Sequence, residues 1–407
     1  MKKGITLYLH VHQPWRIRDY SVFDTASRHE YFDDESESER NNRLVFEKVA
    51  EKSYRPMNRV LQQLLDTQPE FKFSLSITGT FIEQAMAYAP DVLDDFKRLV
   101  ASGRVEIVGE TYNHSLAFFY SRLEFERQVA LHRDLIRSTF GVETTSFRNT
   151  ELAYNDELAR WADESGYKTI LAEGWDPILE WRSPNNVYRP ARTESVRLLT
   201  KNYRLSDDIA FRFGNKAWQD WPLSTDKYMH WLDASLEHGE IINLFMDYET
   251  FGEHQWEDTG IFDFFQQLVN DWSSRDDRAF YTVTETAESF EPVGELSMPH
   301  TVTWADNERD LTAWLGNSMQ QEALRYLYGL ENDIVRSGDL KLIADWRNLQ
   351  TSDHVYYMCT KWFNDGDVHA YFSPYDSPYD AFLYFMNALR DVRYRLMAYH
   401  SSSLGGF

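Results

Sequence analysis

A chain of 407 residues, 43% of them hydrophobic, is long enough to bury a large core, and the usual domain size predicts two or three domains. A formal net charge of −23 argues against nucleic acid as a partner, because phosphate backbones are bound through a surplus of Lys and Arg. The single cysteine, Cys359, excludes an internal disulfide and a metal site built from several thiolates.

The amino-terminal sequence predicts a soluble cytoplasmic protein. The apolar stretch after Lys2 and Lys3 is interrupted by His10, and no small-residue cleavage site follows it, so we expect no signal peptide. No window approaches the roughly 18 uninterrupted apolar residues of a membrane span. We therefore expect no membrane partner.

Short β-branched runs alternate with amphipathic stretches up to about residue 290. A helix is expected over residues 121–141, where Phe125, Val129 and Ile136 share one face and Gly141 stands where the helix would stop. The predicted strands are, in chain order, 5–11, 71–78, 104–110, 145–150, 167–173, 195–201, 240–247 and 279–284.

A second helix is expected to begin after Asn155, as its N-cap, and to stop at Gly166. Strand and helix in alternation predict a parallel sheet, and seven or eight such units favour a closed or nearly closed barrel. An open doubly wound sheet stays an alternative, although no GxGxxG follows any predicted strand. The turn-rich segment 175–222 is expected to be an irregular insertion over the mouth of the barrel.

From Met298 onward the strand pattern gives way to helical stretches at 305–338, 340–363 and 377–399. This change of character predicts a carboxy-terminal helical domain packed on the barrel.

In a barrel of parallel strands the reactive groups lie at the carboxyl ends of the strands. His10 and His12 stand there on the first strand and share a face, because residues i and i+2 of a strand point the same way. The same filter selects a set of residues at the later strand ends: Glu110 and His114, Glu151, Glu173 with Trp175 and Asp176, and Asp247 with Glu249, Glu253 and His254.

Two of these carboxylates suit acid and nucleophile chemistry. Asp247 follows an apolar strand, so we expect a partly desolvated carboxyl group whose raised pKa suits a general acid. Glu151 follows Arg148 and Asn149, which are expected to hold it ionised as a nucleophile. Such a pair is what glycoside hydrolysis needs, although each residue taken alone also fits a helix cap or a solvated loop.

The ordered motifs of the chain resemble those of glycoside hydrolase family 57, the α-amylase-like family. The stretch WADNERDLTAWLGN, which begins at Trp304, is also similar to the amylase-like branch. Five short stretches match the family's regions: HQP at 12–14, GRVEIVGETYNHSL at 103–116, FRNTELAYN at 147–155, MDYETFGEHQW at 246–256 and TSDHVYYMCTKW at 351–362. These stretches occur in order across most of the chain, and together they are far more specific than any lone pattern.

The resemblance implies an α/β fold, an incomplete (β/α)7 barrel over residues 1–295, and an α-helical domain over 296–407 that completes the active-site cleft. It implies a retaining α-amylase that cleaves α-1,4-glucans, with Glu151 as nucleophile and Asp247 as general acid/base. The expected partner is an α-glucan polysaccharide or a maltooligosaccharide, and neither a cofactor nor a metal ion is expected. The residues expected to bind the sugar are His10, His12, Glu110, His114, Trp175, Glu249, His254, Trp304, Asp306, Asp353 and His354.

Three alternatives stay open at this point. Within the family, the chain is alternatively a 4-α-glucanotransferase or a branching enzyme. From another class comes a metal-dependent hydrolase, similar to polysaccharide deacetylases or mannosidases, with His10, His12, His114 and Asp247 as ligands. Against it, the Gln-Pro after His12 lacks the usual aspartate partner. The third alternative is a glucan-binding protein without turnover.

Overall fold

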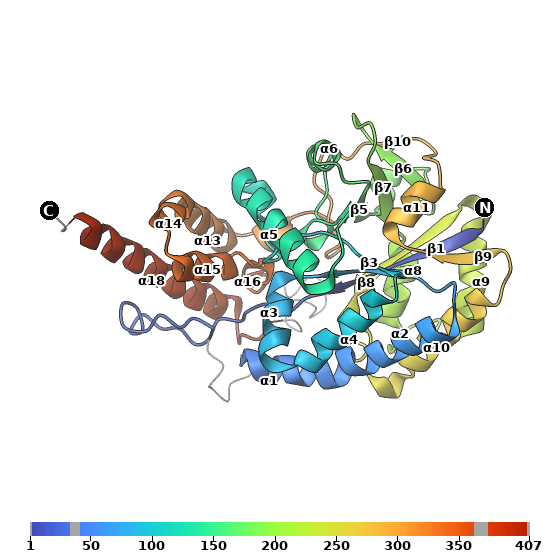
Figure 1. Ribbon diagram of the computed structural model, residues 1–407, viewed down its shortest axis with the longest axis horizontal. Helices are drawn as coiled ribbons and strands as arrows, with labels where there is room; N and C mark the ends of the chain where they lie inside the picture. The colour runs from blue at the N-terminus through green and yellow to red at the C-terminus, as the bar shows by residue number, and fades with distance from the viewer. Residues whose placement is uncertain (1, 33–40, 362–372, 405–407) are drawn as a thin grey trace. The chain divides into compact units, whose positions relative to one another are not determined.

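The computed structural model describes residues 2–32, 41–361 and 373–404, except for the side chains after residue 399 (Figure 1). It divides into two compact units. The predicted domain boundary at residue 295 stays a prediction, and the second unit also takes in two earlier segments. The first unit comprises Met1–His12, Glu47–Glu110 and Leu131–Trp304, and the second comprises Gln13–Phe46, Thr111–Ala130 and Ala305–Phe407.

The strands of the first unit confirm the predicted ones, each of which overlaps an observed strand. The expectation that 175–222 is an irregular insertion is wrong, because the segment contains short helices and a strand of the barrel itself. A further short strand forms between its turns and pairs antiparallel with that barrel strand. The strands are β1 (Lys3–Val11), β2 (Phe73–Ile77), β3 (Val105–Ile107), β4 (Ser146–Phe147), β5 (Thr169–Glu173), β6 (Val187–Pro190), β7 (Arg197–Lys201), β8 (Ile241–Asp247), β9 (Arg278–Tyr281) and β10 (Glu295–Leu296).

The helices between the strands begin and end largely where the sequence predicts. Asn155 caps α6, since its side chain accepts a hydrogen bond from the backbone N–H of Leu158 at 2.9 Å. Gly141 and Gly166 follow α5 and α6 with φ of 71° and 81°. The helices are α1 (Asn42–Val49), α2 (Arg55–Thr67), α3 (Gly79–Tyr88), α4 (Pro90–Ala101), α5 (Arg122–Phe140), α6 (Asp156–Glu164), α7 (Asp176–Leu179), α8 (Tyr203–Asp207), α9 (Thr225–Ser235), α10 (Ile261–Ser273) and α11 (Val283–Ser289).

Seven parallel strands follow one another around an incomplete barrel. In one sheet β1 pairs with β2, β8 and β9, and β2 pairs with β3; the other sheet has the order β10-β6-β7-β5-β4. A bridge between Gly109 and Phe147 joins the end of β3 to β4. The backbone N–H of Asn202 donates to the carbonyl oxygen of Asn243 at 2.9 Å and joins β7 to β8. The order β1-β2-β3-β4-β5-β7-β8 therefore returns to β1, which confirms the predicted (β/α)7 fold.

Large apolar side chains fill this barrel below the carboxyl ends of its strands. Tyr8 is fully buried, lies edge-on to Phe245 with 5.6 Å between ring centroids, and shares a hydrogen bond with Ser76 at 2.5 Å. Because Tyr8 and His10 are two residues apart on β1, the packed core reaches directly up to the histidine. The buried members of this core are Tyr8, Val108, Leu152, Leu171, Val187, Leu199, Ile241, Phe245, Val283 and Phe290.

The second unit is helical in its carboxy-terminal part, as predicted. The long helix α18 packs against α13, α14, α15 and α16. Residues 362–363 of the predicted helical stretch lie outside the described residues. The helices of this part are α12 (Thr312–Leu315), α13 (Ser318–Gly329), α14 (Glu331–Ser337), α15 (Leu340–Asn348), α16 (Ser352–Tyr356) and α18 (Pro378–Leu404).

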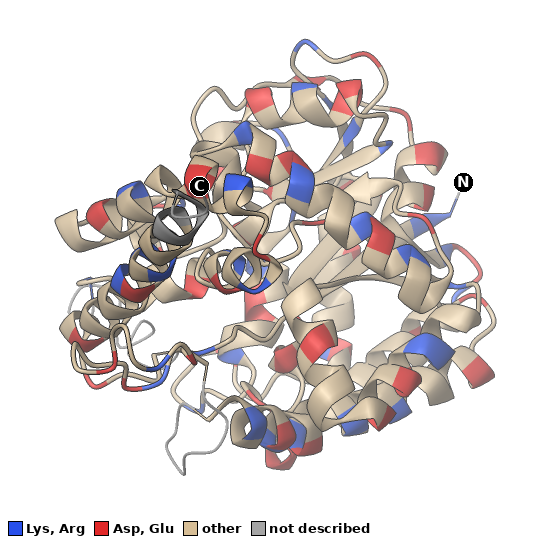
Figure 2. Ribbon diagram, turned by 60° about the vertical axis from the view of Figure 1, so that its left-hand side comes forward, with Lys and Arg blue, Asp and Glu red and all other residues tan. Residues whose placement is uncertain are grey.

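Acidic and basic residues are interspersed along the helices of both units (Figure 2). In the described part of the chain, no helix is both long enough and apolar enough to span a bilayer.

Gly174, directly after β5, allows two backbone segments to approach closely. A Cβ atom there would lie 2.2 Å from the carbonyl oxygen of Lys201, whereas a Cβ on Gly294 would meet nothing within 4 Å. We therefore expect Gly174→Ala to lower the free energy of unfolding by about 1–3 kcal/mol through overpacking. The control, Gly294→Ala, should change it by less than about 0.5 kcal/mol. Urea denaturation followed by circular dichroism measures both, and equal stabilities would contradict the close approach.

Candidate active site

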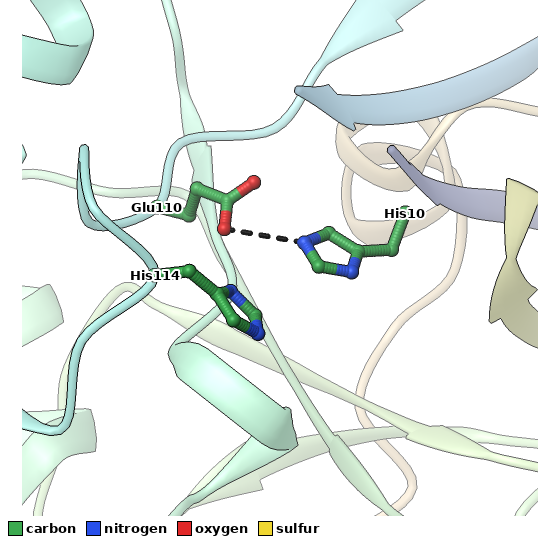
Figure 3. Close-up of side chains that lie close together, drawn as sticks. All are labelled: His10, Glu110 and His114. Atoms are coloured by element: carbon green, nitrogen blue, oxygen red, sulfur yellow. Dashed lines mark hydrogen bonds and ion pairs between the residues drawn. The ribbon is translucent and has the colours of Figure 1, made fainter. Parts of the chain in front are cut away.

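The carboxyl end of β1 presents two stacked imidazoles. The rings of His10 and His12 lie 5.8 Å apart and 17° from parallel, which confirms that they share a face. Figure 3 shows the His10 ring facing Glu110, with its Nε2 atom 3.3 Å from a carboxylate oxygen. The other ring nitrogen, Nδ1, lies 3.5 Å from Oδ1 of Asp247. Since the pairing of β1 with β8 sets His10 opposite Asp247, this contact follows from the strand register.

Glu151 stands on a strained turn after β4. Glu151 and Leu152 have φ of 59° and 51°, a left-handed conformation that non-glycine residues adopt only when their surroundings hold them there. Two hydrogen bonds from Trp304 restrain this turn. Its Nε1–H donates to the Glu151 carboxylate at 2.8 Å, and its backbone N–H donates to the Glu151 carbonyl at 3.3 Å. A pair of backbone hydrogen bonds between Tyr154 and Val302 brings these segments together.

Two cations lie beside the Trp304 indole: Arg148, which the sequence analysis expected to hold Glu151, and Lys201, which it did not include in the site. The guanidinium of Arg148 lies 4.9 Å from the ring centroid and 3.8 Å from Glu110, and its side chain is fully buried. The ammonium of Lys201 lies 5.5 Å from the same ring and 3.8 Å from Glu173. Lys201 stands at the carboxyl end of β7, which is the signal that could have identified it, and the expected hold of Arg148 on Glu151 stays a prediction. Asn149 donates to the carbonyl of Ala153, and its expected hold on Glu151 stays a prediction.

The expected raised pKa of Asp247 is wrong. Burial by itself raises the pKa of this carboxyl group, whose side chain is 38% exposed. The hydrogen bond and electrostatic effect of His10, together with the electrostatic effects of His254 and Arg148, outweigh burial, so the pKa of Asp247 is lowered from its ordinary value. In the protein without substrate, Asp247 is therefore ionised at neutral pH.

It is Glu249, two residues further along, whose pKa is raised. Its carboxyl group is buried and accepts a hydrogen bond from the Tyr54 hydroxyl at 2.5 Å. Burial and the negative charge of Asp247 raise the pKa of Glu249 to about 8, against the effect of the Tyr54 hydrogen bond. At neutral pH this residue is a neutral carboxylic acid. Its predicted role in binding sugar stays a prediction.

Of the other predicted residues of the first unit, His12 and Trp175 lie just after strand ends, as expected, whereas His254 lies in a turn further along the chain from β8. His12 exchanges a hydrogen bond with Thr78 at 3.0 Å between Nδ1 and Oγ1. His254 is half-buried, and burial lowers its pKa. Trp175 follows β5 and is half-buried just before α7. Their contacts with a sugar stay predictions.

In the second unit, the second and fifth motifs lie side by side. Ser115 and Thr351 form an antiparallel bridge, and the backbone N–H of Ser352 donates to the carbonyl of His114 at 2.9 Å. Side-chain ligand atoms of His114 and Asp353 lie within 4.8 Å of each other. Among the described residues, neither unit by itself brings three His, Cys, Asp or Glu ligand atoms this close together. Trp362, the last residue of the fifth motif, lies outside the described residues.

Two further predicted residues of the second unit have shifted pKa values. Asp306 lies 3.0 Å from the ammonium of Lys361, yet burial raises its pKa to about 6. Burial lowers the pKa of His354 to about 4, and its Nε2 atom lies 3.1 Å from the carbonyl oxygen of Asn348. Their roles toward a sugar stay predictions.

The protonated state of Glu249 makes a prediction about stability. The pKa of Glu249 is about 8 in the folded protein and an ordinary 4.5 in the unfolded chain. Between pH 4.5 and 8, Glu249 is therefore protonated in the folded protein and ionised in the unfolded chain. Raising the pH through this window therefore favours unfolding. Glu249→Gln removes the titration and retains an acceptor for Tyr54. The wild type should lose up to about 1.4 kcal/mol of unfolding free energy per pH unit relative to this variant. Urea denaturation at pH 5, 6.5 and 8 measures the difference, and parallel curves would contradict the raised pKa.

Comparison with known proteins gives the family. The family model described as glycosyl hydrolase family 57 matches residues 6–299. A putative alpha-amylase of Methanocaldococcus jannaschii is 41% identical over 402 residues, which cover 96% of this chain and 84% of that protein. An alpha-amylase of Pyrococcus abyssi is 23% identical over 265 residues, or 63% of this chain and 38% of that protein.

Solved structures show the same fold. The 4-alpha-glucanotransferase from Thermococcus litoralis has a TM-score of 0.66 at 14% identity, with 88% of this chain and 59% of that chain covered. The alpha-amylase AmyC from Thermotoga maritima has a TM-score of 0.64 at 13% identity, with 100% and 94% covered. At these identities the likeness concerns the fold alone. The family model matches well over half of the chain and the M. jannaschii relative matches nearly all of it, so the chain belongs to glycosyl hydrolase family 57 and is an enzyme of the glycosidase type.

Proposed function

We propose that this enzyme is a retaining glycoside hydrolase that cleaves α-1,4-glucans as an α-amylase does. The observation that supports this most directly is a path of contacts between the two carboxylates of the first unit. The Trp304 indole donates to Glu151 and lies 6.3 Å from the His10 ring, and His10 in turn reaches Asp247. A nucleophile and an acid/base in one site are the two groups that retaining hydrolysis requires.

The mechanism assigns one task to each carboxylate. Asp247 gives its proton to the glycosidic oxygen as the bond to the anomeric carbon breaks, and Glu151 forms a bond to that carbon. Asp247 then takes a proton from the attacking water, and the sugar leaves Glu151 with retained configuration. The lowered pKa of Asp247 suits its role as a base. A bound glucan would displace water from Asp247 and raise its pKa, which suits the acid step.

Hydrolysis is the reaction we favour over transfer. The M. jannaschii relative is named a putative alpha-amylase, and it shares 41% of its residues with this chain along 84% of its length. More distant relatives include proteins named 4-alpha-glucanotransferase. In a transfer reaction, a sugar hydroxyl would take the place of water.

The roles of the two carboxylates predict different products with azide. We expect Glu151→Ala and Asp247→Ala each to lower kcat/KM on maltoheptaose at least about 100-fold. With α-maltosyl fluoride and azide, Glu151→Ala should form the β-azide, because azide attacks the face that the nucleophile would use. Asp247→Ala should form the α-azide, because azide replaces water at the glycosyl enzyme. Proton NMR distinguishes these products.

One control variant accompanies this experiment. Glu157→Gln changes an exposed glutamate at the start of α6. It should leave the activity on maltoheptaose and the activity on α-maltosyl fluoride unchanged. Folded variants that yield neither azide, beside an active wild type, would contradict the assigned roles.

The acceptor and the metal alternative are tested together. Wild-type protein with maltoheptaose should give shorter maltooligosaccharides alone, with or without EDTA, when products are separated by chromatography over time. Longer oligosaccharides would establish transfer to a sugar. Activity that disappears with EDTA and returns with added divalent metal would favour the metal-dependent alternative.

A further inference from the structure

Glu110 lies at the buried end of a chain of contacts that finishes at the proposed acid/base. We propose that Glu110 is a positioning residue that acts through His10 on Asp247, rather than a group that binds sugar. The inference rests on the proposed function, because it concerns how the general acid of that reaction is held.

Exposure along this chain changes steeply from one end to the other. The side chain of Glu110 is completely buried, that of His10 is 3% exposed and that of Asp247 is 38% exposed. Of these three residues, only Asp247 has a substantially exposed side chain, so a bound sugar would contact Asp247 rather than His10 or Glu110. His10 is positioned to link the two carboxylates. Its Nε2 atom lies 3.3 Å from Glu110 (Figure 3). Its Nδ1 atom lies 3.5 Å from Asp247.

The surroundings of Glu110 hold a carboxylate in place. The Arg148 guanidinium, itself fully buried, lies 3.8 Å away. The backbone N–H of Glu110 donates to Nδ1 of His132 at 3.4 Å, and Nε2 of His132 donates to the carbonyl of Ile77 at 2.9 Å. A buried ion pair gains little stability over apolar packing of the same volume, so stability alone does not explain a carboxylate at this position.

A carboxylate that is hydrogen-bonded to one ring nitrogen of a histidine determines the protonation of the other ring nitrogen. Glu110 accepts a hydrogen bond from the Nε2–H of His10. This hydrogen bond fixes the orientation of the His10 ring and determines whether Nδ1, which faces Asp247, carries a proton. His12 packs on the face of the same ring, and Trp304 lies against it edge-on. Asp247 alone gives its proton to the glycosidic oxygen and recovers one from water. His10 and Glu110 gain and lose no proton over the cycle.

Glu110→Gln tests this role with two substrates that differ in their need for acid. The leaving sugar of maltoheptaose needs a proton, whereas the fluoride of α-maltosyl fluoride leaves without one. We expect kcat/KM on maltoheptaose to fall about tenfold or more, as part of the roughly 100- to 10,000-fold that general acid catalysis supplies. On α-maltosyl fluoride the fall should be less than about threefold, because only the acid step is impaired.

Glu106→Gln is the matched control for this measurement. Glu106 is on β3, four residues before Glu110, and it accepts hydrogen bonds from Ser146 and Thr284. Loss of a structural carboxylate should lower activity on both substrates by the same factor. If Glu110→Gln does not fold, His10→Gln takes its place and should show the same difference between substrates.

The outcomes separate this inference from the proposed function. Equal losses on both substrates, or no loss on either, would show that Glu110 does not act through the acid and would overturn the inference. Wild-type protein that is folded by circular dichroism but inert on both substrates would overturn the proposed function, and the role of Glu110 with it.

Discussion

The register between β1 and β8 is the constraint on which the site depends. It sets His10 directly opposite Asp247, so an imidazole and a carboxylate from residues far apart in the sequence meet at one strand end. Both strands are almost entirely buried, and Tyr8 and Phe245 pack against each other inside the barrel below them. A slip of one residue would turn these side chains to the opposite face. The apolar core that stabilises the barrel thus also fixes the geometry of its polar end.

Electrostatic effects at this end of the barrel shift the pKa values of two neighbouring carboxyl groups in opposite directions. Asp247 and Glu249 are two residues apart, yet the pKa of the first is lowered and that of the second is raised to about 8. The difference comes from their partners. His10, His254 and Arg148 act to lower the pKa of Asp247, whereas Glu249 is buried against the Tyr54 hydroxyl with Asp247 as a negative neighbour. The charge on Asp247 itself helps keep Glu249 neutral.

Much of the fold could be predicted from the sequence, because strand runs and helix stops are local signals. The overlap of every predicted strand with an observed one follows from this. The strand-end rule also selected His10, Glu110 and Asp247, since position along a strand is visible in sequence. Burial was visible too, and it led to the wrong sign for the pKa of Asp247. The sign depends on His10 and Arg148, which approach through pairing between distant segments.

The partner of Glu151 was hidden for the same reason. Arg148 and Asn149 are its neighbours in sequence, but Trp304 comes from 153 residues away and donates to its carboxylate. No local pattern reports such a contact, nor the pairing of the second motif with the fifth in the helical unit through Ser115 and Thr351. The strand β6 escaped notice because turn residues surround its four residues.

Strain and restraint meet at Glu151. A left-handed residue costs about 1–3 kcal/mol, and two such residues in succession, Glu151 and Leu152, persist only if other contacts offset that cost. Leu152 is fully buried in the barrel core, and Trp304 grips Glu151 through both its indole and its backbone. A carboxylate on so constrained a turn has little freedom to leave its orientation. A nucleophile must approach the anomeric carbon from one face, and here the conformational entropy of orienting it is already lost when the protein folds, before the substrate binds.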